Sequence, residues 1–251
     1  MKKVRVIVVL FLTLSALSAQ VPQNMLPSKM AREQIIEHKA YTMSYSSSYV
    51  VPSWLAYKVT NPTVNKEATV KGKYIPDPKI TTRAASKKDY KKSGYLMAQL
   101  CNYLDVMHIE GAAEETFYTS NIVPMKLAFY QHMWLKTEDL IRLWLRDKEA
   151  FYVFTGPITK DAPFPTIGSN KVSVPKHYYK VVYDPDNQEA IAFKFKNGMS
   201  SGSLKSYSMS VADLEKITEI DFFPGFDESL KERLKSKVNY EFWNFELEEE
   251  L

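Results

Sequence analysis

Basic side chains are concentrated between residues 66 and 92, where they could follow the phosphates of a polyanion. The span holds nine Lys and Arg residues but only three acidic ones, Glu67, Asp77 and Asp89. The nine are Lys66, Lys71, Lys73, Lys79, Arg83, Lys87, Lys88, Lys91 and Lys92. Phosphate contacts release counterions, so such binding falls steeply with salt and ignores base sequence. A solvated loop is the competing interpretation. If the span binds nucleic acid, the candidate contacts are Lys87, Lys88, Lys91 and Lys92.

Other reactive residues are few and form no familiar catalytic arrangement. The chain has four histidines and a single cysteine, Cys101, which excludes a disulfide framework and any multi-cysteine metal site. Neither G-x-x-x-x-G-K nor G-x-G-x-x-G occurs among its eight glycines, which argues against a phosphate-cradling loop. We predict that Cys101 is a buried core thiol.

The first 19 residues have the pattern of an export signal. Lys2, Lys3 and Arg5 precede an apolar run over 6–12 and small residues over 15–19. The run is shorter than the roughly 20 residues that span a bilayer. We expect cleavage near Ala19 and export to the periplasm or the outside of the cell. With no cysteine near residue 19, a lipoprotein is not expected. Removal of the signal leaves 30 basic against 29 acidic residues, so net charge says little about partners.

Residue periodicity predicts an α+β domain with a central antiparallel sheet flanked by helices. Hairpins outnumber strand–helix–strand units, which disfavours a doubly wound parallel sheet. Strands are predicted over 53–59, 151–155, 178–183 and 190–195, and helices over 30–38, 128–148, 210–218 and 228–237. The predicted organisation is a signal at 1–19, an N-terminal lead over 20–40, a domain over 41–245 and a frayed acidic tail at 246–251. Within the lead, residues 21–29 are expected to be mobile. No membrane span is expected after signal removal.

Short stretches spread along the domain resemble the DNA/RNA non-specific endonuclease family. They are YTMSY at 41–45, WLAY at 54–57, DYKKSGY at 89–95, FYTSN at 117–121 with Pro124, TGP at 155–157, VPKHYYKV at 174–181, AIAF at 190–193 and IDFFP at 220–224. Each stretch is short, but their order and spacing agree with the family. The resemblance implies a ββα-metal fold. It also implies a divalent metal held by an Asn, a His acting as general base and an Arg that stabilises charge.

The catalytic motif implied by the resemblance is altered in this chain. In the family D-R-G-H follows S-G-Y directly, whereas Leu96, Met97, Ala98 and Gln99 follow here. The spacing to the later S-N pair agrees without a gap, so Gln99 stands where the general base is expected. A carboxamide has no proton affinity near neutral pH and cannot deprotonate a water. Leu96 and Met97 replace the Asp and the Arg of the motif, so both of those charges are missing.

The metal-ligand position implied by the family is altered too. The family has an Asn four residues before a Trp and a Glu four residues after it. Trp134 and Glu138 are present, but Tyr130 occupies the Asn position. An α-helix would place all three on one face. A neutral phenol is a poor ligand for a hard dication, and one carboxylate does not make a magnesium site.

We therefore interpret the chain as an exported pseudo-nuclease without a metal or other cofactor. Its partner is either nucleic acid or another envelope or secreted protein. The alternative is an active Mg²⁺-dependent endonuclease with a rearranged site.

Overall fold

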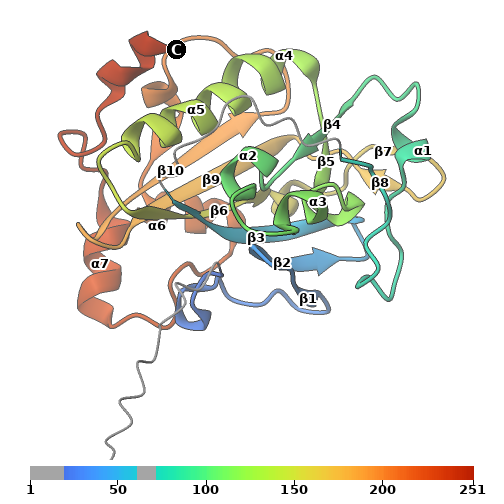
Figure 1. The fold of residues 1–251 in the computed structure, drawn as a ribbon, viewed down its shortest axis with the longest axis horizontal. Coiled ribbons are helices and arrows are strands. Elements are labelled where there is room, and N and C mark those ends of the chain that lie inside the picture. The colour runs from blue at the N-terminus through green and yellow to red at the C-terminus, as the bar shows by residue number, and fades with distance from the viewer. Residues whose placement is uncertain (1–19, 61–71) are drawn as a thin grey trace, which may run out of the picture.

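A seven-stranded antiparallel sheet forms the centre of the fold (Figure 1). The computed structural model describes residues 20–60 and 72–251, so the predicted signal segment, Lys66 and Lys71 lie outside the described residues. In spatial order the strands are β1 (Gln34–Glu37), β2 (Tyr41–Ser46), β3 (Val51–Thr60), β6 (Ala150–Pro157), β9 (His177–Asp184), β10 (Glu189–Lys196) and β11 (Ser208–Met209). The predicted α+β class with a central antiparallel sheet is confirmed.

Two small two-stranded sheets lie outside the central one. They are β4 (Leu96–Gln99) with β5 (Ile122–Met125), and β7 (Thr166–Ile167) with β8 (Val172–Ser173). The helices are α1 (Lys87–Tyr90), α2 (Tyr103–Val106), α3 (Ala112–Glu115), α4 (Leu127–Phe129), the π-helix η3 (Tyr130–Trp134), α5 (Leu135–Trp144), α6 (Val211–Thr218) and α7 (Glu228–Ser236). Short 3-10 helices are η1 (Gln23–Met25), η2 (Thr119–Asn121), η4 (Thr159–Asp161), η5 (Leu204–Tyr207) and η6 (Phe245–Glu250).

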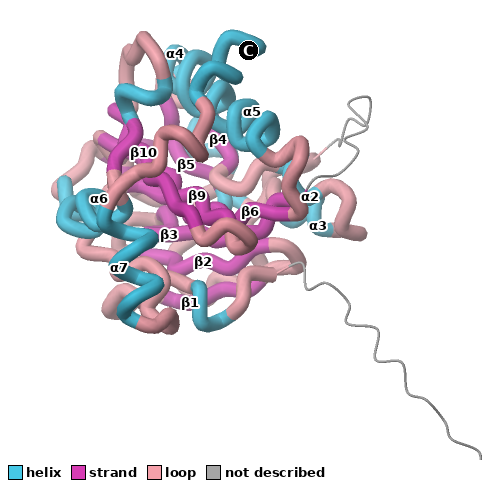
Figure 2. Tube along the Cα trace, turned by 90° about the vertical axis from the view of Figure 1, so that its left-hand side faces the viewer, coloured by secondary structure: helices cyan, strands magenta, loops and turns pink. Residues whose placement is uncertain are grey.

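Both faces of the central strands are covered, which explains their near-continuous apolar sequences. Successive side chains of a strand point to opposite faces. On β9, Tyr178 and Val182 enter the core beneath α5 and the β4–β5 pair, whereas Tyr179 and Val181 enter the core beneath α6 and α7. Figure 2 shows these helices on opposite sides of the sheet. Lys180 therefore points to the α5 side.

Local signals located the β9–β10 hairpin and two helix starts correctly. Asp184 opposes Glu189 where the strands predicted over 178–183 and 190–195 are joined. The Ser210 hydroxyl accepts the Asp213 N–H at the start of α6, and the Asp227 carboxylate accepts the Leu230 N–H at the start of α7. N-cap residues of this type satisfy backbone donors that the first turn leaves free.

The helix predicted over 30–38 is wrong. Residues 34–37 form β1, in which Gln34 opposes Tyr45 of β2. Ile35 packs on one core and Ile36 on the other, an alternation of two that a strand provides and a helix does not. The segment before β1 is anchored as well, because Val21 and Leu26 are buried. The lead thus contributes a strand to the sheet, and its residues 21–29, expected to be mobile, bury two side chains in the core.

The acidic tail is docked rather than frayed. Within η6, the Glu248 carboxylate accepts hydrogen bonds from Lys136 Nζ at 2.7 Å, from Ser203 Oγ at 2.7 Å and from the Leu204 N–H at 3.0 Å. These bonds lower the pKa of Glu248 although burial opposes its charge. Across the described residues, we find no helix whose length and apolar character would suit a bilayer.

Candidate functional site

Strand β4 carries three of the four altered positions, Leu96, Met97 and Gln99. Leu96 opposes Met125 of β5, and Gln99 opposes Ile122. Because strand side chains alternate, Met97 and Gln99 share one face while Ala98 is buried on the other. The side chains of Leu96, Met97 and Gln99 are all partly exposed.

Gln99 is held by hydrogen bonds of its side-chain amide and of its backbone carbonyl. Its Nε2 donates to the Thr116 Oγ1 at 2.8 Å and to the Thr116 carbonyl at 3.1 Å. Its backbone carbonyl accepts the indole N–H of Trp134 at 3.3 Å, which joins β4 to η3. The Gln99 side chain is therefore a neutral amide whose N–H groups are already hydrogen-bonded to Thr116.

Tyr130 lies at the start of the π-helix η3, half-buried. The wider π turn means that the spacing of four assumed for an α-helix does not hold between Tyr130 and Trp134. Burial and, secondarily, the charge of Glu138 raise the pKa of Tyr130 to about 12. The phenol is accordingly neutral at physiological pH and a weak candidate for a metal ligand.

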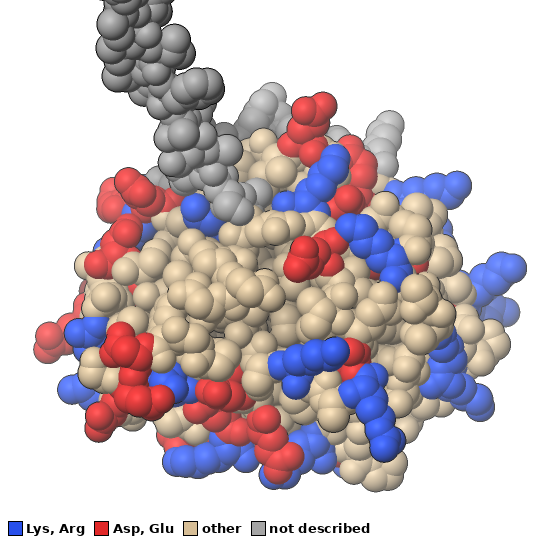
Figure 3. All heavy atoms as spheres, turned by 90° about the horizontal axis from the view of Figure 1, so that it is seen from below, with Lys and Arg blue, Asp and Glu red and all other residues tan. Residues whose placement is uncertain are grey.

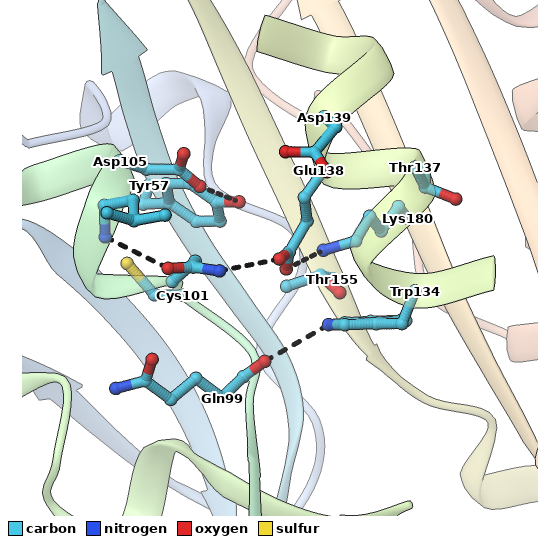
Figure 4. Close-up of polar contacts among 12 residues, drawn as sticks. Tyr57, Gln99, Cys101, Asp105, Trp134, Thr137, Glu138, Asp139, Thr155 and Lys180 are labelled. Carbon is cyan, nitrogen blue, oxygen red and sulfur yellow. Dashed lines mark hydrogen bonds and ion pairs between the residues drawn. The ribbon is translucent and has the colours of Figure 1, made fainter. Parts of the chain in front are cut away.

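Glu138, the remaining carboxylate, is buried in α5 and engaged at both oxygens (Figure 4). Its Oε1 lies 3.2 Å from the Lys180 Nζ, and its Oε2 accepts the Asn102 Nδ2 at 2.8 Å. The Lys180 ammonium lies 3.8 Å from the centre of the Trp134 ring. Burial raises the pKa of Glu138 and lowers that of Lys180, while each partner opposes the shift of the other.

A second ion pair lies beside the first. The Asp105 carboxylate accepts Arg142 Nε at 2.8 Å and the Tyr57 hydroxyl at 3.2 Å. Burial disfavours the charge of Arg142, but Asp105 and Glu138 outweigh burial and raise its pKa. Cys101 is fully buried, and burial raises its pKa, as expected of an inert core thiol. Most polar groups of this region pair with one another, while Nη2 of Arg142 is buried without a hydrogen-bond partner among the described residues.

Sequence reasoning missed Lys180, Asn102, Asp105 and Arg142 as members of this network. One signal was available for Lys180, because it interrupts the apolar run from Tyr178 to Val182 in a predicted strand. A charge in such a run needs a buried counterion. Its partner could not be identified, since Glu138 lies on a different element.

Replacing Lys180 with methionine should lower the free energy of unfolding by about 3 kcal/mol at pH 7, because Glu138 would lose its buried counterion. Urea unfolding of the Lys180→Met variant measures this loss. The pKa of Glu138, already raised by burial, would rise further, so the loss should shrink as the pH falls and the carboxyl becomes neutral. Lys136→Met is the control, because Lys136 pairs with Glu248 nearer the surface and should cost less than about 1 kcal/mol. Equal losses in the two variants would contradict a buried charged pair.

The predicted lysine segment forms a basic surface next to β4. Lys87, Lys88, Lys91 and Lys92 are exposed and have no ion pair among the described residues. Figure 3 shows Lys and Arg side chains along the right-hand edge, the end where α1 lies in Figure 1, while acidic side chains lie elsewhere on that face.

The two described carboxylates of this segment do not neutralise that surface. Asp77 and Asp89 are both buried. Asp77 binds His38 at 2.8 Å and Ser120 at 2.5 Å, whereas Asp89 binds Ser86 and Asn170. From residue 72 to residue 104 the chain therefore presents no exposed carboxylate. Lys79 and Arg83 donate to backbone carbonyls of Glu37 and Ser47 instead of to acids.

The family comparison agrees with this architecture. A model described as DNA/RNA non-specific endonuclease matches residues 18–229, most of the chain. The chain belongs to that family. Its sheet with β4, β5 and α5 on one face is thus the endonuclease-family domain.

Individual relatives support the assignment. The chain is 28% identical over 236 residues to the mitochondrial nuclease EXOG of Mus musculus, covering 81% of this chain and 64% of that protein. For EXOG of Danio rerio the identity is 30% over 209 residues, with coverages of 75% and 61%. The chain thus spans less than two thirds of the length of these two relatives. Nuclease C1 of Cunninghamella echinulata is 29% identical over 216 residues, with coverages of 77% and 84%.

A solved structure shares the fold. The chain in the structure described as the EndoG/EndoGI complex superposes with a TM-score of 0.71 at 24% sequence identity, covering 80% of this chain and 89% of that chain. This likeness confirms the predicted ββα-metal nuclease-like fold.

The donors at the altered site do not fit the divalent metal that the endonuclease family implies. Tyr130 offers a neutral phenol, Gln99 donates to Thr116, and both oxygens of Glu138 are engaged. Within residues 20–60 and 72–251, no three His, Cys, Asp or Glu side chains cluster as a metal site would require.

Proposed function

We propose that this chain is an exported, catalytically inactive member of the endonuclease family that binds nucleic acid. The observation that carries the proposal is a contrast between two neighbouring regions. The altered site has a carboxamide and a phenol where a base and a metal ligand are expected. The adjacent surface around α1 keeps four exposed lysines that have no ion pair within residues 20–60 and 72–251.

The loss of catalysis follows from the chemistry of the replacements. Hydrolysis of a phosphodiester needs a group that removes a proton from water and a cation that offsets the charge on phosphate. Gln99 cannot take the proton, and Leu96 and Met97 carry no charge. The Arg142 guanidinium binds Asp105 and Asp139, so it does not supply the missing charge.

Binding to nucleic acid is favoured over binding to an envelope or secreted protein by the composition of the surface. Exposed lysines without acidic neighbours attract phosphates over several ångströms and require no shape match. Protein interfaces usually have an apolar centre with few charges. Of the large apolar side chains that are well exposed in the described chain, none lies between residues 76 and 126.

Digestion and metal binding test the loss of catalysis. We expect no EDTA-sensitive cleavage of plasmid DNA or RNA with Mg²⁺ or Mn²⁺, and calorimetry should show no Mg²⁺ site tighter than about millimolar. The protein should be taken from the exported fraction, where its intact mass should correspond to a chain starting near Gln20. Retention of DNA in a gel-shift assay without metal is expected.

Three outcomes would overturn parts of the proposal. Cleavage that EDTA abolishes would favour the alternative of an active enzyme with a rearranged site. Co-purification with an envelope protein, together with no DNA retention, would favour a structural role. A mass that includes Met1 would contradict export by signal cleavage.

A further inference from the structure

The turn between β7 and β8 is fastened to α1 by one carboxylate, although the two segments are far apart in the chain. Asp89 Oδ1 accepts the Asn170 N–H at 3.0 Å, and Oδ2 accepts the Asn170 Nδ2 at 2.8 Å. On the α1 side, the same Oδ2 accepts the N–H of Ser86 at 2.7 Å and its hydroxyl at 3.0 Å. Asp89 thus bonds to two separate pieces of chain.

Gly168 allows the β7–β8 turn to lie close against Asp89 of α1. Gly168 has φ +66°, a conformation that favours glycine. A Cβ at residue 168 would lie 2.2 Å from Asp89 Oδ1 and 2.4 Å from Asp89 Cα, so any side chain would push the turn away from α1. Burial opposes the charge of Asp89, but the hydrogen bonds from Asn170 and Ser86 lower its pKa, so it is ionised at neutral pH.

The fastening places another lysine beside the basic surface. Lys171 follows Asn170 directly, is exposed and has no ion pair among the described residues. The chain contains no Asp or Glu from residue 162 to residue 183, so no acid of this segment opposes Lys171. The Asp89 carboxylate is buried, so it places no exposed negative charge beside these lysines.

We propose that Asp89 is a positioning residue that holds Lys171 with the four α1-side lysines as one surface for the phosphates of duplex nucleic acid. The inference rests on the proposed nucleic-acid binding and adds a second segment, the β7–β8 turn, to it. The predicted contact set thereby becomes Lys87, Lys88, Lys91, Lys92 and Lys171.

The charge-removing variant Asp89→Asn separates positioning from simple electrostatics. Loss of a negative charge near a polyanion would, by itself, tighten binding. If Asp89 positions Lys171, binding should weaken instead, because an Asn amide turns N–H groups toward the donors of Asn170 or Ser86. We expect the slope of log affinity against log salt for a short duplex DNA to become shallower by about 0.9, the value of one phosphate contact. Asp213→Asn makes the same charge change on α6 and should leave the slope unchanged.

Two further variants test the same proposal in case the Asp89→Asn variant does not fold. Lys171→Ser, a surface change, should flatten the salt slope by about 0.9. Gly168→Ala changes no charge and should also flatten it, and adding Lys171→Ser to Gly168→Ala should then have little further effect. Circular dichroism and a melting curve verify that each variant is folded.

The outcomes distinguish this inference from the proposed function. If the unmodified chain does not bind duplex DNA, the proposed function fails and this inference fails with it. If the unmodified chain binds but Lys171→Ser leaves the slope unchanged, or Asp89→Asn binds more tightly, only the positioning role is overturned.

Discussion

Replacing Lys87, Lys88, Lys91 and Lys92 with serine is expected to weaken binding of duplex DNA by at least about 100-fold at about 50 mM salt. Each lost phosphate contact removes about 0.9 from the salt slope, so the slope should become shallower by about 3.6. The lysines are exposed and unpaired within the described chain, so their removal should not disturb the fold. Fluorescence anisotropy across a salt series gives both quantities.

The control makes the same change of charge elsewhere. Lys216, Lys231, Arg233 and Lys237 lie on or directly after α6 and α7, at the far side of the molecule from α1 in Figure 1. Changing these four to serine should leave most of the affinity intact. Equal weakening by both sets would mean that overall charge, rather than the surface around α1, attracts the DNA.

Restoring the family's catalytic side chains at the altered site is expected to create Mg²⁺-dependent cleavage of DNA, which the unmodified protein is expected to lack. The variant combines Leu96→Asp, Met97→Arg, Gln99→His and Tyr130→Asn, with Glu138 unchanged. A general base typically contributes about 10²- to 10⁴-fold, so even partial restoration should be measurable as plasmid nicking. Leu96 and Met97 are partly exposed, so the two introduced charges can reach water, and the expected loss of stability is small.

The matched control for this experiment keeps Gln99 and carries the other three changes. It should bind Mg²⁺ more tightly than the parent and cleave nothing, since it lacks a base. A folded quadruple variant that binds Mg²⁺ but does not cleave would contradict the idea that only the chemical groups were lost. In that case the π turn at Tyr130 and the Lys180–Glu138 pair would hold the groups in an unproductive arrangement.

Features defined by neighbouring residues were predictable from the sequence. The β9–β10 hairpin follows from a turn between two β-rich runs, and the starts of α6 and α7 follow from N-cap side chains. The location of the altered motif stays a prediction, which rests on its spacing to Asn121. These inferences need only local patterns or a family resemblance.

Features defined by distant partners were not predictable. β1 is a strand because β2 pairs with it, although the same residues in isolation also suit a helix. The π turn over Tyr130–Trp134 was not predicted either, because the sequence pattern indicates a continuous α-helix there. The Glu138–Lys180 pair joins α5 to β9, and the Asp89–Asn170 contact joins α1 to a turn. Each requires the tertiary structure.

The contacts of residues 243–248 have a practical consequence for protein engineering. Glu248 is bound to Lys136 and to the amide of Leu204. The ring of Trp144 contacts those of Trp243 and Phe245 at 4.9 Å and 5.4 Å between centres. Deletion of the residues from 243 onward would remove the two aromatic rings that pack on Trp144 of α5. An affinity tag is better appended after Leu251, whose side chain is exposed, than substituted for the last turn.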